Sequence, residues 1–317
     1  MRHLISYSVY EDISSVLPEG GPGSLAEMGC DGLELLTGFD PVDPRCAVMS
    51  PAVHLPYATD WYRAWSGRDT SDPEDDDIAR FMYFGRDRDD VTDTLETALR
   101  MASPLDPAYG VLHAGNANID EILMRDFTDT DTGILSAFAE MVNSVAARFP
   151  GGEPPFRILF ENLWWPGLKL IDPREYRLLA ERVEFDRWGL CLDTGHMMAA
   201  LGGFKTQEEG AEAVSRVISS YPEDMRDRVV TMHLHMSTSK DYISSFAPRG
   251  REGRSAMDML SEGYPHVGRI DQHLPFSSDV CVGLVEALRP DFLTHEMVSP
   301  DRVKAVGDFS LQRSFFR

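Results

Sequence analysis

Short apolar runs that each end in an acidic residue or a histidine recur along the chain, and this recurrence restricts the fold more than any other feature. Such a run is typical of a β-strand that is buried on both faces, as in a parallel sheet. The polar residue then lies where the strand leaves the core. The segments with this pattern are Val53–His54, Val111–His113, Ile158–Glu161, Trp188–Asp193, Val229–His233 and Phe292–Glu296.

Expected strands and helices alternate from one end of the chain to the other. The strands are His3–Ser8, Gly32–Leu36, Ala52–His54, Tyr109–His113, Arg157–Glu161, Trp188–Asp193, Val229–His235 and Asp291–Glu296. The helices are Ser24–Met28, Ile78–Ala102, Ile119–Phe149 with a break near residues 128–132, Pro173–Val183, Gln207–Ser220, Cys281–Leu288 and a C-terminal helix or tail. A long loop containing Pro248–Arg254 is expected after the seventh strand, and Asp271 and His273 fall in the loop region before Cys281.

This alternation favours a parallel sheet, and eight repeats favour its closure. We therefore predict one (β/α)8 TIM barrel spanning residues 1–317, with a C-terminal helix or tail. The main competitor is an open doubly wound sheet, which would carry a glycine-rich phosphate loop after its first strand. Gly20–Gly23 does not fit the G-x-G-x-x-G spacing of such a loop.

The charge balance narrows the choice of partners. Lysine and arginine number 30 against 52 acidic residues, which gives a net charge of −22. A field of this sign repels phosphate backbones, so we expect a small-molecule substrate, in the first place a sugar, and neither nucleic acid nor a membrane. The sequence has no signal-peptide plan and no run of about 18 apolar residues, and we expect a cytoplasmic protein whose oligomeric state stays open.

The strand ends predict a metal site. In a barrel the C-terminal ends of all strands meet at one face, so Glu161, Asp193, His233 and Glu296 should converge there. A lone histidine or glutamate at a strand end is more often a hydrogen-bonded core residue. Three carboxylates at one mouth, however, repel each other unless a cation or shared protons compensate them. The donor set suits manganese, magnesium, zinc or cobalt without choosing among them.

Such an ion would support proton transfer at carbon. If it held both oxygens of a hydroxy-ketone, it would acidify the neighbouring C–H and stabilise the enediolate formed when a carboxylate removes that proton. Return of the proton to the opposite face gives an epimer, and return to the adjacent carbon gives an isomer. Glu161 and Glu296 are the candidate catalytic carboxylates.

Further residues are candidates for substrate binding. Trp61 and Trp164 follow strand ends and could wall a pocket, with helix-to-barrel packing as the alternative. Arg251, in the one dense basic patch, could clamp a substrate anion, with pairing to nearby acids as the alternative. We also assign His235 to substrate binding, and Glu34 is a weaker candidate.

The segments Phe160–Asn162, Leu190–His196, His233–His235 and Thr294–Glu296 resemble the strand ends of the xylose isomerase-like barrel superfamily. This superfamily contains sugar isomerases and epimerases together with apurinic-site endonucleases. The resemblance implies that Glu161, Asp193, His233 and Glu296 hold one divalent metal. It also implies that the two glutamates act as acid and base on a sugar, a sugar acid or a sugar phosphate.

The endonuclease branch implies a larger cluster of zinc ions. The additional ligands would be His54, His113, His196, Asp271 and His273, so a second or third metal ion stays open. Two departures argue against this branch: His235–Met236 stand where the endonucleases have Asn-Asp, and Leu274–Asp279 replace a glycine-rich loop. We predict a metal-dependent isomerase or epimerase; the alternatives are a zinc-dependent phosphodiesterase of the apurinic endonuclease type and a non-catalytic ligand-binding barrel.

Overall fold

Eight parallel strands close into a barrel in the order of the sequence, with β1 paired to both β2 and β8. The structure is a computed structural model, and it describes residues 1–10, 22–39, 42–250 and 252–316. The strands are β1 (Arg2–Ser8), β2 (Gly32–Leu36), β3 (Ala52–His54), β4 (Tyr109–His113), β5 (Arg157–Glu161), β6 (Trp188–Asp193), β7 (Val229–His233) and β8 (Phe292–His295). The predicted TIM barrel is confirmed.

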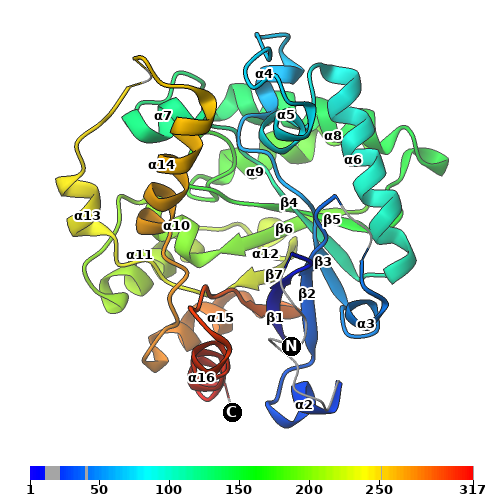
Figure 1. The fold of residues 1–317 in the computed structure, drawn as a ribbon. Coiled ribbons are helices and arrows are strands. Elements are labelled where there is room, and N and C mark those ends of the chain that lie inside the picture. The colour runs from blue at the N-terminus through cyan, green and yellow to red at the C-terminus, as the bar shows by residue number, and fades with distance from the viewer. Residues whose placement is uncertain (11–21, 40–41, 251, 317) are drawn as a thin grey trace.

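Helices surround the barrel (Figure 1). They are α2 (Pro22–Glu27), α3 (Pro44–Ala47), α4 (Trp61–Trp65), α5 (Asp76–Tyr83), α6 (Arg88–Ala102), α7 (Ile119–Met124), α8 (Asp131–Ala146), α9 (Pro173–Arg182), α10 (Thr194–Ala200), α11 (Gln207–Ser219), α12 (Glu223–Arg226), α13 (Lys240–Ser245), α14 (Ala256–Ile270), α15 (Val282–Leu288) and α16 (Arg302–Arg313). Short 3-10 turns are η1 (Ser103–Leu105), η2 (Pro150–Gly152) and η3 (Asp279–Cys281). Within the described residues, no helix is long and apolar enough to cross a membrane.

The predicted helix over residues 78–102 is wrong, because the chain forms two helices there. Helix α5 ends at Phe84, whose backbone is left-handed with φ of 65°, and Gly85 follows with φ of 140°. Asp87 then caps α6 by accepting hydrogen bonds from the backbone of Asp89 and Asp90. A left-handed residue ends one helix and an aspartate cap begins the next. The break expected near residues 128–132 is confirmed, since α7 and α8 flank it.

Helix α14 lies where the sequence predicts a loop. Pro265 stands inside it and removes a backbone donor, which is why its pattern does not predict a helix. A capping box between Ser255 and Asp258 begins the helix. Met259 and Leu260 are buried on its inner face, so tertiary packing outweighs the local signal.

Strand alternation separates the barrel interior from its helical coat. One buried cluster takes its side chains from six of the barrel strands and consists of Leu4, Ala52, Tyr109, Val111, Leu159, Cys191 and Val230. An irregularity between β6 and β7 shifts the register, so that Asp193 stands beside His233. Such a bulge re-aims the side chains that follow it. Buried polar residues, among them Glu161, Asp193 and His233, occupy the C-terminal ends of strands β5, β6 and β7.

Replacing Gly263 of α14 with alanine should destabilise the protein. An added Cβ would lie 2.1 Å from Cδ1 and 2.8 Å from Cγ1 of Ile119 on α7. Ile119 is β-branched and stiff, so overpacking should cost about 1–3 kcal/mol. Gly268→Ala in the same helix is the control, because its Cβ would meet nothing within 4 Å in the described chain. Thermal unfolding should give a lower midpoint for Gly263→Ala only; equal midpoints would contradict this close packing.

Candidate metal centre

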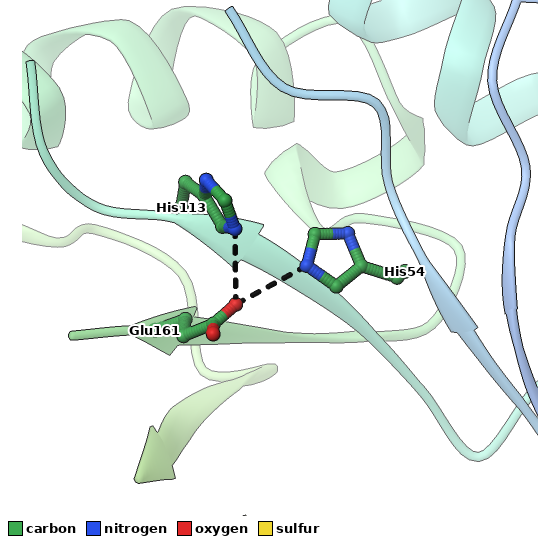
Figure 2. Close-up of side chains that lie close together, drawn as sticks. All are labelled: His54, His113 and Glu161. Carbon is green, nitrogen blue, oxygen red and sulfur yellow. Dashed lines mark hydrogen bonds and ion pairs between the residues drawn. The ribbon is translucent and has the colours of Figure 1, made fainter. Parts of the chain in front are cut away.

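The carboxylate of Glu161, at the end of β5, is the hub of a buried polar cluster at the mouth of the barrel. Its Oε2 atom lies 3.2 Å from Nε2 of His54 and 3.3 Å from Nε2 of His113. Figure 2 shows both imidazoles pointing at this one oxygen. Its Oε1 atom lies 3.3 Å from Nδ1 of His196 and 3.2 Å from Nδ1 of His233. Four imidazoles thus surround a carboxylate that is only 1% exposed.

The predicted ligand set comes together around this hub. Donor atoms of Glu161, Asp193, His233 and Glu296 all lie within 4.8 Å of one another. Nδ1 of His233 lies 2.7 Å from Oε2 of Glu296 and 3.8 Å from Oδ2 of Asp193. Oε2 of Glu296 is buried and makes no hydrogen bond within the described chain. Glu296 Oε2 and His233 Nδ1 thus lie close together without a hydrogen bond, as expected for two ligand atoms that face one cation.

The Leu-Asp-Thr-Gly-His motif is explained by the junction of β6 and α10. Asp193 ends the strand and caps the helix, with Oδ1 accepting a hydrogen bond of 2.6 Å from the backbone N–H of His196. Its Oδ2 lies 2.7 Å from Nε2 of His235. A Cβ on Gly195 would lie 2.1 Å from the ring of His235. Glycine is therefore needed for this imidazole to reach the aspartate.

A second group of ligand atoms adjoins the hub. Oδ2 of Asp271 lies 2.9 Å from Nε2 of both His196 and His273. These three residues form a potential metal-holding group, as do His54, His113 and Glu161. Cys191 forms another with Glu161 and His233.

Backbone carbonyls orient three of the histidines in the same way. Nδ1 of His54 lies 2.8 Å from the carbonyl oxygen of Leu55, and Nδ1 of His196 lies 2.9 Å from that of Asn162. Nδ1 of His273 lies 3.2 Å from the carbonyl oxygen of Glu296. A carbonyl only accepts, so each Nδ1 carries a proton, and in a neutral ring Nε2 would face a carboxylate with a lone pair. Two acceptors face each other unless a proton or a cation lies between them, and this arrangement fits a divalent metal.

The same contacts set the protonation of the metal-free cluster. Burial opposes ionisation of Glu161, but the imidazoles of His233 and His113 hold its pKa well below the usual range. Burial also disfavours the charged form of His273, yet Asp271 raises the pKa of this imidazole to about 9. Against burial, His273 and His196 hold the pKa of Asp271 well below its usual value. Protons on imidazoles therefore balance the carboxylates when no metal is bound.

A pocket of about 190 Å³ opens above the cluster. Its polar wall includes His54, His113, His196, Asp271, His273 and Glu296, and its apolar wall includes Ile119, Ile122, Trp165, Leu260, Tyr264 and Val267. Tyr57 also lines it and stacks on His113 with ring centroids 4.4 Å apart. Glu296 thus faces the pocket, whereas Glu161 lies beneath the imidazoles. The sequence did not single out Tyr57 as a wall residue, and Trp165 was a weaker candidate than Trp164; Tyr57 and Trp165 stand in the aromatic segments after strands three and five.

Trp61 and Trp164, predicted to bind substrate, lie outside the pocket wall. The indole nitrogen of Trp61 donates a 2.8 Å hydrogen bond to the carbonyl of Gly115, and its ring packs edge-on against Phe138 in the core. Trp164 packs edge-on against Trp165, and it is Trp165 that lines the pocket. Helix-to-barrel packing, the alternative interpretation, describes both positions.

His235, another predicted substrate contact, also lies apart from the pocket wall. His235 is fully buried, and its ring stacks on His273 with centroids 4.0 Å apart. Arg251 lies outside the described residues. Its neighbours Arg249 and Arg254 both pair with Glu262 on α14, the former at 3.3 Å.

A sequence model of the xylose isomerase-like TIM barrel matches residues 84–290 of this chain. The chain belongs to the xylose isomerase-like TIM barrel family. A comparison with curated protein sequences finds no match.

Several solved structures share the fold of this chain. A D-tagatose 3-epimerase-like protein is 14% identical, with 100% of this chain and 97% of that chain covered and a TM-score of 0.56. Endonuclease IV from Thermus thermophilus is also 14% identical, with 100% and 99% covered and a TM-score of 0.53. 3-Keto-D-glucoside 4-epimerase from E. coli is 13% identical, with 99% of each chain covered and a TM-score of 0.50. At these identities the likeness concerns the fold alone.

Metal affinity should rise with pH. Burial opposes protonation of His196, but Asp193 and Asp271 raise the pKa of this imidazole well above its usual value, as Asp271 does for His273. These imidazoles are therefore protonated at neutral pH and must lose their protons to bind a metal ion. Chelator competition should give a Co²⁺ dissociation constant at least about tenfold lower at about pH 8.5 than at about pH 6.5. An affinity independent of pH over this interval would contradict the assigned protonation.

Proposed function

We propose that this barrel is a divalent-metal-dependent isomerase or epimerase that moves a proton on a carbon next to a carbonyl group. The observation that carries the proposal is the convergence of Glu161, Asp193, His233 and Glu296 within 4.8 Å beneath a small pocket. Carboxylate and imidazole donors gathered in this way suit a divalent ion. The family contains enzymes of this class, and two of the structural relatives are named as epimerases or epimerase-like proteins.

The pocket supports a small substrate that is uncharged away from the metal. No lysine or arginine lines it in the described part of the chain. Its wall opposite the carboxylates is formed by α7 and α14 with residues such as Ile122, Leu260 and Val267. Its volume of about 190 Å³ is below the range of roughly 300–1,000 Å³ found for drug-sized ligands. A short hydroxy-ketone or aldehyde sugar fits these walls better than a sugar phosphate.

A divalent ion held here would polarise the substrate carbonyl and acidify the adjacent C–H. Glu296 lines the pocket, so we assign it the removal and return of the proton. Glu161 contacts four imidazoles below the wall, and in this proposal it orients them and completes the ligand set. If Glu296 alone transfers the proton, it returns the proton from the same side to the neighbouring carbon, which is isomerisation. The apolar roof keeps bulk water from the deprotonated carbon.

Incorporation of solvent deuterium into a panel of short ketoses and aldoses tests this proposal. Metal-loaded protein should exchange the proton next to the carbonyl, and Glu296→Gln should slow exchange by about 10²–10⁴-fold because it removes the base. Glu286→Gln, at an exposed position of α15, is the control and should exchange like the unaltered protein. Absence of exchange across the panel, with metal content verified, would reject the proposal.

A second candidate is phosphoester hydrolysis with several metal ions. The specific observation in its favour is that two further ligand groups, His54–His113–Glu161 and His196–Asp271–His273, adjoin the first. Two or three neighbouring ions could clamp the attacking and leaving oxygens of a phosphoryl group. Against duplex DNA as the substrate stand the net charge of −22 and the apolar roof of the pocket.

Metal stoichiometry separates the two candidates. We expect elemental analysis to find one tightly held ion per chain, because one ion suffices for proton transfer at carbon. We also expect no hydrolysis of bis(p-nitrophenyl) phosphate and no nicking of abasic duplex DNA. Two or three ions together with phosphodiester hydrolysis would replace the first candidate by the second.

A further inference from the structure

We propose that Tyr264 on α14, supported by Phe81 on α5, closes the outer end of the pocket and limits the length of the carbonyl substrate that the barrel accepts. The inference rests on the proposed function in one respect, because it takes a small carbonyl compound to occupy this pocket. Tyr264 lines the pocket together with Leu260 and Val267 of the same helix. It is nevertheless 46% exposed, so it stands at the boundary between the pocket and solvent.

The position of Tyr264 on α14 directs its side chain toward the pocket. Leu260 precedes it by four residues and Val267 follows it by three, so the three side chains lie along one face of the helix. The hydroxyl end of Tyr264 is the buried end of its side chain. Burial raises the pKa of this phenol to about 13, and the neighbouring Tyr57 hydroxyl raises it further. The ring therefore lies across the mouth of the pocket, with one face open to solvent.

Phe81 reaches the Tyr264 ring from the opposite side of the barrel. Helix α5 follows β3 and helix α14 follows β7, and these two strands lie opposite each other in the closed barrel of β1 to β8. The ring centroids of Phe81 and Tyr264 lie 6.1 Å apart, with an angle of 36° between the ring planes. Tyr57 and Thr59, which follow β3, line the pocket together with residues of α14. A contact between α5 and α14 therefore crosses above the pocket.

Phe81 lies outside the buried face of its own helix. The buried side chains of α5 are Ala79, Met82 and Tyr83. The side chain of Phe81 is 43% exposed, so packing of α5 on the barrel does not explain it, whereas pairing with a second aromatic ring does. Helix α5 is fixed at the edge of the pocket, because the backbone N–H of Asp60, next to Thr59, donates a 3.1 Å hydrogen bond to the carbonyl of Met82. Phe81 is thereby held where it can support the Tyr264 ring.

A ring at this place limits the substrate by length. The pocket of about 190 Å³ has its carboxylates and imidazoles at one side and Tyr264 at its solvent boundary. A short hydroxy-ketone bound at the metal centre fits beneath the ring, but the far end of a longer chain would meet it. A pocket wall that rejects one extra methylene group discriminates by roughly 10–200-fold. Tyr264 is not a candidate metal ligand, so its replacement should widen the pocket and leave the ligand set in place.

Hydroxy-ketones of increasing length test the inference. Dihydroxyacetone, erythrulose and fructose are compared by solvent-deuterium exchange with the metal-loaded protein. For the unaltered protein, kcat/KM should fall steeply from erythrulose to fructose. Tyr264→Ala should raise the ratio of the fructose value to the erythrulose value by at least about tenfold. Phe81→Ala leaves the Tyr264 ring without its support and should raise this ratio by about two- to tenfold.

Two variants serve as controls. Tyr264→Phe keeps the ring and should keep the ratio of the unaltered protein. Met257→Ala removes another exposed side chain of α14, one that does not line the pocket, and should also leave the ratio unchanged. If Tyr264→Ala leaves the ratio unchanged, or if either control raises it equally, the inference is overturned.

Acylation by diethyl pyrocarbonate separates failure of this inference from failure of the proposed function, because it requires neither metal nor turnover. The imidazole of His113 lines the pocket, and mass spectrometry of its peptide gives the rate at which the reagent enters the metal-free protein. Closure by the Tyr264 ring predicts a several-fold faster reaction in Tyr264→Ala and an unchanged rate in Tyr264→Phe. If the unaltered protein exchanges none of the ketoses, the proposed function fails and these rates decide alone: the faster reaction supports closure of the pocket by Tyr264, and equal rates overturn it.

Discussion

The mouth of this barrel is organised by the need to keep the Glu161 carboxylate ionised where water does not reach it. An isolated charge in such a place is strongly unfavourable, and only paired or metal-bound charges persist there. Four imidazole nitrogens within 3.3 Å of its two oxygens meet this need. They come from β3, β4, α10 and β7, so the hub connects distant parts of the chain and makes the cluster depend on barrel closure.

Much of the fold was predictable because the barrel strands are short, apolar and buried on both faces. Strand β4 and strand β5 begin and end where the sequence predicts. The helices were less predictable, since their stability comes from packing rather than propensity. Helix α14 contains Pro265 and still forms, while one expected helix divides at Phe84. Packing decides the first outcome, whereas the second follows local signals at Phe84, Gly85 and Asp87 that the expected helix passed over.

The site was predictable to the extent that barrel topology decides it. Inward positions at strand ends must meet, so Glu161, Asp193 and His233 could be grouped without coordinates. The wall of the pocket could not be derived in this way. Aromatic residues that follow a strand can turn outward to the helices, as Trp61 does, or inward, as Tyr57 does. The depth of each acidic residue below the pocket could not be predicted from the sequence either. Glu296 lines the pocket, Glu161 lies below it, and Glu34 lies deeper still.

Helix α14 roofs the pocket, and Asp271, a member of the ligand cluster, is the residue on which that helix ends. The roof of the pocket and Asp271 are therefore parts of one continuous segment of backbone. A substitution in the roof that moves the helix would also move this carboxylate. The fit of a ligand and the geometry of the carboxylate cluster are therefore coupled through the backbone.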